Sequence, residues 1–417
     1  MSSRAHEENT VTPFLRRIRI SDYRSIASCD VRLGPLTVLA GPNAAGKSNF
    51  LDAIRFVRDA LRTSPGQALE ARGGLEEVLH RDSTGRRADT FCIRLEVRVP
   101  VVEDGKPTAL DATYLWRVGA NPNRGEPPAV VLREELSFDG LDGGFRFPPR
   151  SLSDHQVVWH DGTLLADSAR GTTHTSAVYF RLLSMHFYEL LTPVLRDIDS
   201  SPGQRRRLWT LGERGAHLAR VLDVLAQRQP WAKETIDGYL AAMIENAVGL
   251  DGVEVPEADL AYLVGRFAGE GGTVAKVDRR SLSDGTLRLG GVLAALFQPL
   301  ALQGQIPFVG IEEPEISLHP PVLGALYDAL VAASRNTQVL VTTQSADLLD
   351  NAAADPAHLL VVRDDGNGTR IGPIDRAGRG LLADGVLSLP DLLRSGEMRP
   401  EPLPAEETDE GEGEDAR

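Results

Sequence analysis

One eight-residue stretch, Gly41–Ser48, constrains the fold more than any other part of the chain. Its sequence, GPNAAGKS, fits the G-x-x-x-x-G-K-[ST] pattern of a phosphate-binding loop. The apolar run Leu36–Ala40 before it is typical of a buried strand, and apolar side chains recur with helical spacing after Asn49. The loop is therefore predicted to lie between a strand and a helix start, as the pattern requires.

The chemistry of this loop follows from its position. Glycines let backbone N–H groups crowd around phosphate oxygens, and the helix N-terminus adds partial positive charge. Lys47 can reach the β- and γ-phosphates of a nucleotide, and the Ser48 hydroxyl can bind Mg²⁺. The residues expected at the nucleotide are Gly41, Pro42, Asn43, Ala44, Ala45, Gly46, Lys47, Ser48 and Asn49.

Two adjacent carboxylates, Glu312 and Glu313, follow the apolar run Ile306–Ile311, which is typical of a second buried strand. Burying both without a cation would be costly. Mg²⁺ and an attacking water give a reason to keep them: Glu312 would hold the metal or its water shell, and Glu313 would orient or deprotonate the water. The alternative is a pair of exposed loop glutamates, which the following Pro314 and Glu315 disfavour.

Antiparallel strands are predicted in the N-terminal part of the chain. Phe14–Ile20 alternates apolar and basic residues, and a return strand at Val31–Leu33 completes a hairpin that leads into the phosphate loop. In its turn, Tyr23 and Arg24 are candidate nucleotide contacts, by stacking and by charge; the alternative is a turn aromatic and a solvated arginine. Further antiparallel strands are expected at Phe91–Val99, Tyr114–Val118 and Val130–Phe138.

Beyond these strands the apolar period becomes helical, from Tyr179 to Gly249, and His186 on that face is interpreted as a core histidine. A helix is then expected to open at Ser281–Thr286, with Ser283 or Asp284 as its N-cap. Strands and helices alternate afterwards, which predicts an α/β layer with ligand at the strand C-termini. Its further elements are expected at Pro321–Ala333 (helix), Gln338–Thr342 (strand) and Leu359–Val362 with Thr369–Ile371 (hairpin).

Composition narrows the function classes. The two cysteines, Cys29 and Cys92, cannot form a disulfide framework. We expect both to be buried thiols in a reducing cytoplasm. We expect no signal peptide, because the N-terminal residues do not show a cationic segment followed by an apolar core. The most apolar long stretch, Leu289–Ile311, contains glutamines and prolines, which favours a helix, a turn and a strand over a membrane span.

The net charge of −14 is unevenly distributed. Eight acids and one arginine lie in the last 18 residues, so about half of the excess belongs to a segment expected to be disordered. The rest of the chain is only mildly acidic, which argues against a globally basic nucleic-acid binder but allows a local basic face. The densest basic run, Arg205–Arg207, is either a solvated loop end or a phosphate-backbone contact.

Taken together, these motifs resemble an ABC-type ATPase of the SMC/RecF class, close to the stand-alone RecF-like ATPases with an AAA-type core. The matching pieces occur in the family's order: Ile18–Arg24 leading into Leu36–Ile54, Leu282–Thr286, Phe308–Pro320 and Val339–Leu349. The resemblance implies a homodimer that clamps two ATP molecules, each held by one subunit's phosphate loop and the other subunit's signature helix. Ser283 and the Gly285 backbone would then meet the γ-phosphate across the interface, with Asp284 turned away.

Three positions depart from the family's pattern. Gln344 stands where the family usually has His; Gln can orient a water or donate to phosphate but carries no charge, so this γ-phosphate sensor would be weakened. Glu312 stands where transporter relatives have Asp at the metal, and His319 where they have an acidic loop residue. The glutamine that follows the first helix in this class is unassigned, with Gln67 and Gln156 as candidates.

The expected fold is an α/β P-loop NTPase, an ABC/SMC-type head with an N-terminal antiparallel β subdomain and an inserted helical subdomain. Five parts are expected along the chain. They are a disordered N-terminus (1–12), a first ATPase lobe with the phosphate loop and antiparallel strands (13–175), the helical subdomain (176–255), a second ATPase lobe with the signature and the paired carboxylates (256–395) and an acidic disordered tail (396–417).

The resemblance implies a cytoplasmic ATPase that uses ATP and Mg²⁺, with Glu313 and Gln344 as catalytic residues, and that acts on DNA in repair or in defence against foreign DNA. The DNA part rests on the resemblance alone, because the sequence shows no base-reading motif. The alternative is a nucleotide-gated module with slow turnover that controls a separate nuclease or toxin, which Gln344 favours. The motor of a membrane transporter is disfavoured, because Leu282–Thr286 departs from the transporter signature.

Overall fold

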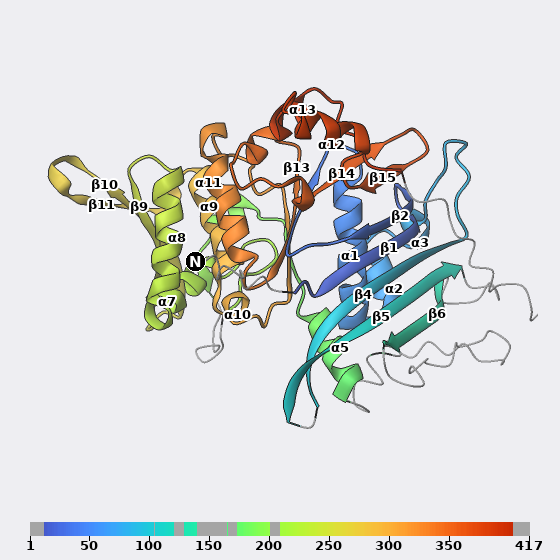
Figure 1. The fold of residues 1–417 in the computed structure, drawn as a ribbon. Helices are drawn as coiled ribbons and strands as arrows, with labels where there is room; N and C mark the ends of the chain where they lie inside the picture. Colours follow the sequence, from blue (N-terminus) through green and yellow to red (C-terminus); the bar gives the residue numbers. More distant parts are fainter. Residues whose placement is uncertain are drawn as a thin grey trace, which may run out of the picture.

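The computed structural model describes residues 12–103, 105–120, 129–139, 165, 173–200 and 209–402. Figure 1 shows an N-terminal lobe on an antiparallel sheet, a helical lobe on the opposite side, and two C-terminal helices at the top between them. Residues 1–11 and 403–417 lie outside the described part, as do Arg205–Arg207 and Gln156.

A six-stranded sheet forms the centre of the molecule, in the order β15-β14-β3-β13-β12-β7. Neighbouring strands run parallel except in the β14–β15 hairpin, which confirms the predicted closing hairpin. Every residue of β3 and β13 is buried, as expected for parallel strands that are covered on both faces. The strands are β3 (Leu36–Ala40), β7 (His186–Tyr188), β12 (Phe308–Glu312), β13 (Gln338–Thr343), β14 (Leu359–Asp364) and β15 (Thr369–Gly372).

Different helices cover the two faces of this sheet. On one face, Leu36 and Val38 of β3 pack in a core with α9 (Asp284–Phe297) and α11 (Leu323–Ala333). On the other face, Leu39 joins a second core built around α1 (Lys47–Arg62). Side chains alternate across a strand, so one short run supplies both cores and fixes α1 and α9 on opposite faces.

The N-terminal lobe is a five-stranded antiparallel sheet in the order β2-β1-β4-β5-β6, which confirms the predicted strands. Its inner face packs on α1 through a cluster of aromatic rings that includes Phe56, Phe91 and Trp116. The strands are β1 (Leu15–Tyr23), β2 (Ile26–Arg32), β4 (Thr90–Glu103), β5 (Lys106–Ala120) and β6 (Ala129–Phe138). The helices beside them are α2 (Pro65–Glu70), α3 (Leu75–Val78) and α5 (Thr173–Leu183).

The segment predicted as a helical subdomain, 176–255, needs correction because it contains strands. His186–Tyr188 forms β7 at the edge of the central sheet, beside β12. A small antiparallel sheet, whose first long strand begins at Ala247, packs against two helices. The described elements between residues 192 and 278 are α6 (Thr192–Arg196), β8 (Asp199–Ser200), α7 (Leu218–Arg228), α8 (Pro230–Met243), β9 (Ala247–Val255), β10 (Leu260–Ala268) and β11 (Val274–Asp278). The β10–β11 hairpin projects from the left edge of Figure 1.

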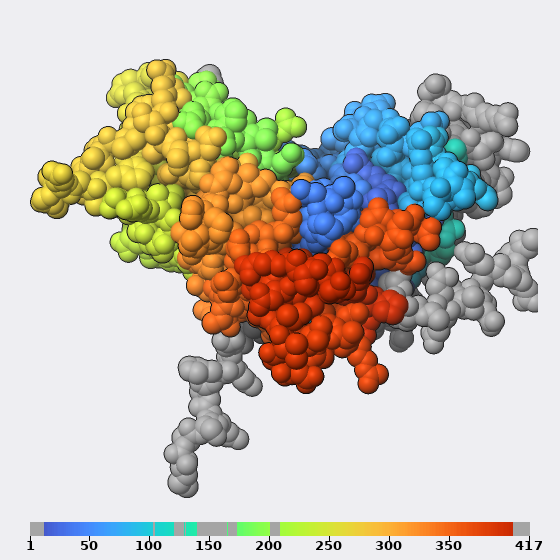
Figure 2. All heavy atoms as spheres, turned by 90° about the horizontal axis from the view of Figure 1, so that it is seen from above, coloured from blue at the N-terminus to red at the C-terminus, as the bar shows by residue number. Residues whose placement is uncertain are grey.

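The C-terminal boundary also needs correction. Residues 396–402 belong to the packed structure and not to the predicted tail, because the Met398 side chain is fully buried and Pro400 pairs with Ile374. They follow α12 (Arg376–Ala383) and α13 (Leu389–Arg394). In Figure 2 this red segment lies against the orange segments and borders the blue N-terminal lobe.

The longest apolar helical stretch, Asp284–Leu302, joins α9 to α10 (Pro299–Leu302). Its length and composition would allow it to cross a membrane, but 78% of its most apolar window is buried inside the fold, as in a core helix. His186 lies half-buried beside Tyr188, and burial lowers the pKa of its imidazole to about 4. Cys29 is buried and Cys92 is half-buried, and both are free thiols.

Candidate nucleotide site

The phosphate loop lies where the motif predicts, between the C-terminal end of β3 and the first turn of α1. Gly46 precedes α1 with φ 101°, in the left-handed region that favours glycine. A Cβ at this position would lie 2.0 Å from the hydroxyl of Thr369 on β15. That hydroxyl donates to the carbonyl of Ala45 at 2.9 Å. The loop is thus braced by the closing hairpin, which fixes its backbone before any ligand binds.

Lys47 is buried against this loop, with 5% of its surface exposed. Its Nζ donates to the carbonyl oxygens of Gly41 and Pro42, at 2.9 Å each. Burial lowers the pKa of Lys47, while the nearby charges of Glu313 and Glu315 act in the opposite direction. The ammonium group is therefore held over the loop by carbonyl oxygens that phosphate oxygens can replace.

Ser48 and Glu312 meet across the junction of α1 and β12. The Ser48 hydroxyl donates to Glu312 Oε2 at 2.7 Å. Burial raises the pKa of Glu312, and the bond from Ser48 partly offsets this shift. A hydroxyl and a carboxylate from adjacent elements form the hard oxygen donor set that Mg²⁺ prefers, so these two residues fit the expected metal site.

Glu313 marks a sharp turn after β12. Its φ of 42° lies in the left-handed region, which is strained for a residue with a side chain. Its backbone N–H donates to the hydroxyl of Thr342 on β13 at 3.1 Å. The turn brings the second predicted carboxylate to the edge of the sheet where the phosphate loop begins, because β12 and β3 both run parallel to β13.

A third carboxylate, Glu315, was not assigned a role from the sequence. It is 8% exposed and accepts hydrogen bonds from the Thr343 hydroxyl and, at 3.4 Å, from the Gln344 N–H. Its second oxygen, Oε2, has no hydrogen-bond partner in the part of the chain that the structure describes. Burial raises the pKa of Glu315. This residue ties the turn after β12 to the residue that follows β13.

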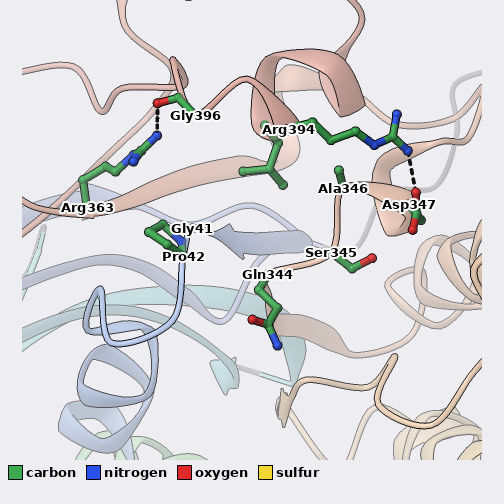
Figure 3. Close-up of a pocket in the computed structure, with 10 residues that line it drawn as sticks. Gly41, Pro42, Gln344, Ser345, Ala346, Asp347, Arg363, Arg394 and Gly396 are labelled. Atoms are coloured by element: carbon green, nitrogen blue, oxygen red, sulfur yellow. Dashed lines mark hydrogen bonds and ion pairs between the residues drawn. The ribbon is translucent and has the colours of Figure 1, made fainter.

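Gln344 is exposed and lines a pocket of about 390 Å³ together with Gly41 and Pro42 at the start of the phosphate loop (Figure 3). Arg363 and Arg394 line the same pocket from the C-terminal part of the chain. Arg363 donates to the Gly396 carbonyl and Arg394 pairs with Asp347. Gln344 thus lies beside the start of the phosphate loop, where its side chain can contact a water or a phosphate.

Arg24 lies in the turn between β1 and β2, with φ 50°. Its Nε is 3.2 Å from Asp52 on α1, one turn after Ser48. Asn49 donates to the neighbouring Ser25 hydroxyl at 2.6 Å, so the turn is fastened to the start of α1. Tyr23 does not stack on this surface, because it is fully buried and its hydroxyl donates to Asp52.

The predicted signature helix begins as expected, with Ser283 as the N-cap of α9. Its hydroxyl accepts from the Thr286 N–H at 3.1 Å. A Cβ at Gly285 would lie 2.6 Å from the Ser317 carbonyl, so the helix start packs tightly on the loop after Glu313. Among the described residues, no hydrogen bond or ion pair joins Ser283 or Gly285 to the phosphate loop of the same chain.

Two other positions differ from what the sequence suggested. Gln67 is exposed on α2, which packs against α1, and in the described part of the chain no hydrogen bond joins its side chain to the phosphate loop. The residue that lies near the metal site is Glu189, which follows β7 and whose charge raises the pKa of Glu312. The sequence carried no signal for it, because β7 has only three residues.

The core of the chain matches a known protein family. Residues 36–91 and 212–350 match the family model described as "AAA domain, putative AbiEii toxin, Type IV TA system". These ranges contain the phosphate loop, the signature helix, the paired glutamates and Gln344. The four expected parts of the nucleotide site therefore lie inside the matched segments.

Curated relatives match over shorter segments. The chain is 32% identical over 156 residues to the DNA replication and repair protein RecF of Gloeobacter violaceus, which is 36% of this chain and 37% of that protein. It is 44% identical over 43 residues to the OLD nuclease of Thermus scotoductus, which is 10% of this chain and 8% of that protein. The chain thus spans little more than a third of the length of the RecF relative and less than a tenth of the OLD nuclease.

Solved structures share the fold. An Smc head bound to the C-terminal winged-helix domain of ScpA aligns with a TM-score of 0.54 at 14% identity, over 86% of this chain and 97% of that one. The Smc head domain with an extended coiled coil, bound to the C-terminal domain of ScpA from Pyrococcus furiosus, gives 0.52 at 13% identity, over 90% and 100%. The matched family model and the RecF relatives bear out the resemblance to ABC-type ATPases of the SMC/RecF class, and the Smc heads share the fold of the chain.

Proposed function

We propose that the protein binds ATP with Mg²⁺ on its phosphate loop and hydrolyses the ATP as a two-fold dimer. The observation that carries this proposal is the 2.7 Å hydrogen bond between Ser48 and Glu312. It joins the first turn of α1 to the end of β12, which is where a metal bound to the β- and γ-phosphates would lie. The neighbouring Glu313 then adjoins the terminal phosphate.

Each residue of the site has a role in this scheme. Lys47 exchanges the Gly41 and Pro42 carbonyls for phosphate oxygens, since it binds both carbonyls through the same ammonium group. Glu313 orients the attacking water and accepts its proton, and Gln344 orients the water or donates to the terminal phosphate. When Mg²⁺ is bound by Ser48 and Glu312, it neutralises charge on the phosphates.

The dimer part of the proposal is supported by the exposed start of the signature helix. Ser283 is exposed at the start of α9, and the Gly285 backbone lies beside it. A helix N-terminus with a free face favours an anion, and here the anion would be the triphosphate held by a second copy. Asp284 pairs with Arg196, so its charge is neutralised at that surface.

The proposed setting is DNA metabolism in the cytoplasm, either in repair or in defence against foreign DNA. The names of the relatives support this: a DNA replication and repair protein on one side, and a nuclease on the other. Turnover that rises when DNA is added would support direct action on DNA, and turnover that DNA does not change would contradict it.

The decisive test is the Glu313→Gln variant. It keeps the size and hydrogen-bonding capacity of the side chain but removes the general base, so it should bind ATP and remain as an ATP-bound dimer on size exclusion. Turnover should fall by about 100-fold, as typical for loss of a general base. Wild-type turnover in this variant would refute the role of Glu313, and a protein that stays monomeric with ATP would refute the dimer.

A second function has one specific observation in its favour. Gln344 occupies the mouth of the phosphate loop and cannot carry charge, which suits a slow nucleotide-gated module that controls a separate nuclease or toxin. The Gln344→His variant separates the two readings. A several-fold rise in turnover would show that Gln344 keeps hydrolysis slow and favour the regulatory module. Turnover that falls would show that Gln344 is already the effective group and favour the first proposal.

A further inference from the structure

Asp284 places a negative charge at the start of the signature helix, where the proposed dimer needs to hold a triphosphate. The carboxylate is 61% exposed, so it is not removed from that surface by burial. Its Oδ1 accepts a hydrogen bond of 2.6 Å from Arg196 Nη2. Arg196 is the last residue of α6 and lies 88 residues earlier in the chain. A separate element therefore supplies the compensating charge.

The same guanidinium also holds the loop before the helix. Arg196 Nη1 lies 3.1, 3.0 and 2.9 Å from the carbonyl oxygens of Arg279, Arg280 and Leu282. In return, Arg279 Nη1 donates to the carbonyl of Arg196 at 2.7 Å. A planar fork of donors can bind several acceptors in one fixed geometry, which a lysine cannot reproduce. Arg196 thus binds three carbonyl oxygens of the segment that leads into the signature helix.

Close packing of α6 on α9 sets the position of Arg196. A Cβ at Gly291 would lie 2.9 Å from a methyl carbon of Leu195 and 3.0 Å from one of Leu190. Leu195 is almost fully buried in this contact. Because Gly291 has no side chain, α6 approaches the backbone of α9 and brings its last residue to the helix start. The element that carries Arg196 follows β7, which lies next to the strand of Glu312.

We propose that Arg196 is the positioning residue of the signature helix: it fixes residues 279–284 and cancels the Asp284 charge, so that Ser283 and Gly285 can receive the triphosphate of a second copy. This inference rests on the proposed ATP-bound dimer. It assigns Arg196 to the nucleotide bound by the other chain and not to the one bound by its own phosphate loop. Loss of Arg196 should therefore spare ATP binding and abolish dimerisation.

The experiment measures labelled ATP retained on dimers after size exclusion, in the full chain carrying Glu313→Gln. A second substitution, Arg196→Ala, should reduce the retained ATP at least tenfold, while the affinity of the monomer for a fluorescent ATP analogue stays within twofold. Arg196→Lys should recover only part of the retention, because it restores charge without the fork. Arg228→Ala, at the exposed C-terminal end of α7, is the matched control and should retain ATP fully.

Mixing two defective chains distinguishes the two possible sites of action. The Arg196→Ala chain has an intact phosphate loop, and a Lys47→Ala chain has an intact signature helix, so one complete site forms in each mixed dimer. Up to half of the retention should return, since neither variant forms an ATP-bound dimer with itself and each mixed dimer holds one ATP in place of two. No recovery on mixing, or Arg196→Ala monomers that fail to bind the analogue, would overturn the inference alone. If the Glu313→Gln chain itself retains no ATP as a dimer, the proposed function fails and the inference falls with it.

Discussion

The helices α1 and α9 both begin at a loop that the sequence assigns to phosphate binding, yet the two helix starts are built differently. At α1 the loop is closed on itself: Lys47 bonds to carbonyls of its own loop, and Ser48 bonds to Glu312. At α9 the start is exposed, capped by its own Ser283 and neutralised by Arg196 from another element.

Because of this difference, the start of α1 is a binding site within one chain, whereas the start of α9 is an exposed surface. The α1 start has a cation, a metal donor pair and a braced backbone within one chain, so it can hold a nucleotide without a partner. The α9 start has only a cap and helix N–H groups, and helix ends alone hold anions weakly in water. It gains strength when a second chain excludes water from it, because the local dielectric then falls. Substitutions at the two helix starts should therefore have different consequences.

The largest effect is expected at α1, from Lys47→Ala. Removing a charged donor to two phosphates should cost about 3 kcal/mol, or roughly a 100-fold loss of ATP affinity. Titration of the purified monomer with a fluorescent ATP analogue measures this directly. Lys106→Ala is the matched control, because Lys106 is exposed at the start of β5 and should leave the affinity unchanged. Equal affinities for the two variants would remove the basis for calling α1 a self-contained site.

A smaller effect is expected at α9, from Gly285→Ala. The new Cβ would lie 2.6 Å from the Ser317 carbonyl, so either the helix start or the loop after Glu313 has to move by several tenths of an ångström. The ATP affinity of the monomer should not change, whereas ATP-dependent dimerisation should weaken by about tenfold, the equivalent of 1.4 kcal/mol. Size exclusion across a range of protein concentrations measures the shift.

The control for this variant is Gly238→Ala, in the middle of α8. A Cβ there meets nothing within 4 Å, so alanine should stabilise the helix by about 0.5–1 kcal/mol and leave dimerisation unchanged. If Gly285→Ala lowers the monomer's ATP affinity as much as it lowers dimerisation, the two helix starts are coupled within one chain, and the contrast between them is lost.

Sequence reasoning located α1 and β12 because each motif is local. Alternation or continuous apolar runs identify the strands, and polar residues at their C-terminal ends meet at one edge of a parallel sheet. The Ser48–Glu312 pair follows from that rule together with the phosphate-loop motif, although the two residues are far apart in sequence. The strand order, with β3 between β13 and β14, had no such local signal.

Positions that depend on contacts between distant elements could not be predicted. Arg196 ends a five-residue helix whose place is set by Gly291, and Glu189 follows a three-residue strand. Neither element is long enough to show a period. The helices α12 and α13 were missed for a related reason: they are short, and Gly and Pro occur within them. These elements are specified by packing and not by local pattern.

The smallest expected effect is a pH dependence of Mg²⁺ binding at the start of α1, where Ser48 donates to Glu312 of β12. Burial raises the pKa of Glu312, so the folded protein holds this proton more tightly than the unfolded chain does. Without metal, this group should stabilise the fold as the pH falls through the raised pKa, because the buried charge is removed. Mg²⁺ needs the carboxylate, so Mg²⁺ affinity should fall as the pH is lowered through the raised pKa. The terminal phosphate of ATP also titrates near pH 6, but it does so equally in wild type and in Glu312→Gln. The difference between these two proteins, in Mg²⁺ titrations of ATP binding by the monomer, therefore isolates the carboxyl group. Parallel pH profiles would mean that Glu312 does not bind the metal, and the self-contained character of α1 would then rest on Lys47 and the loop backbone.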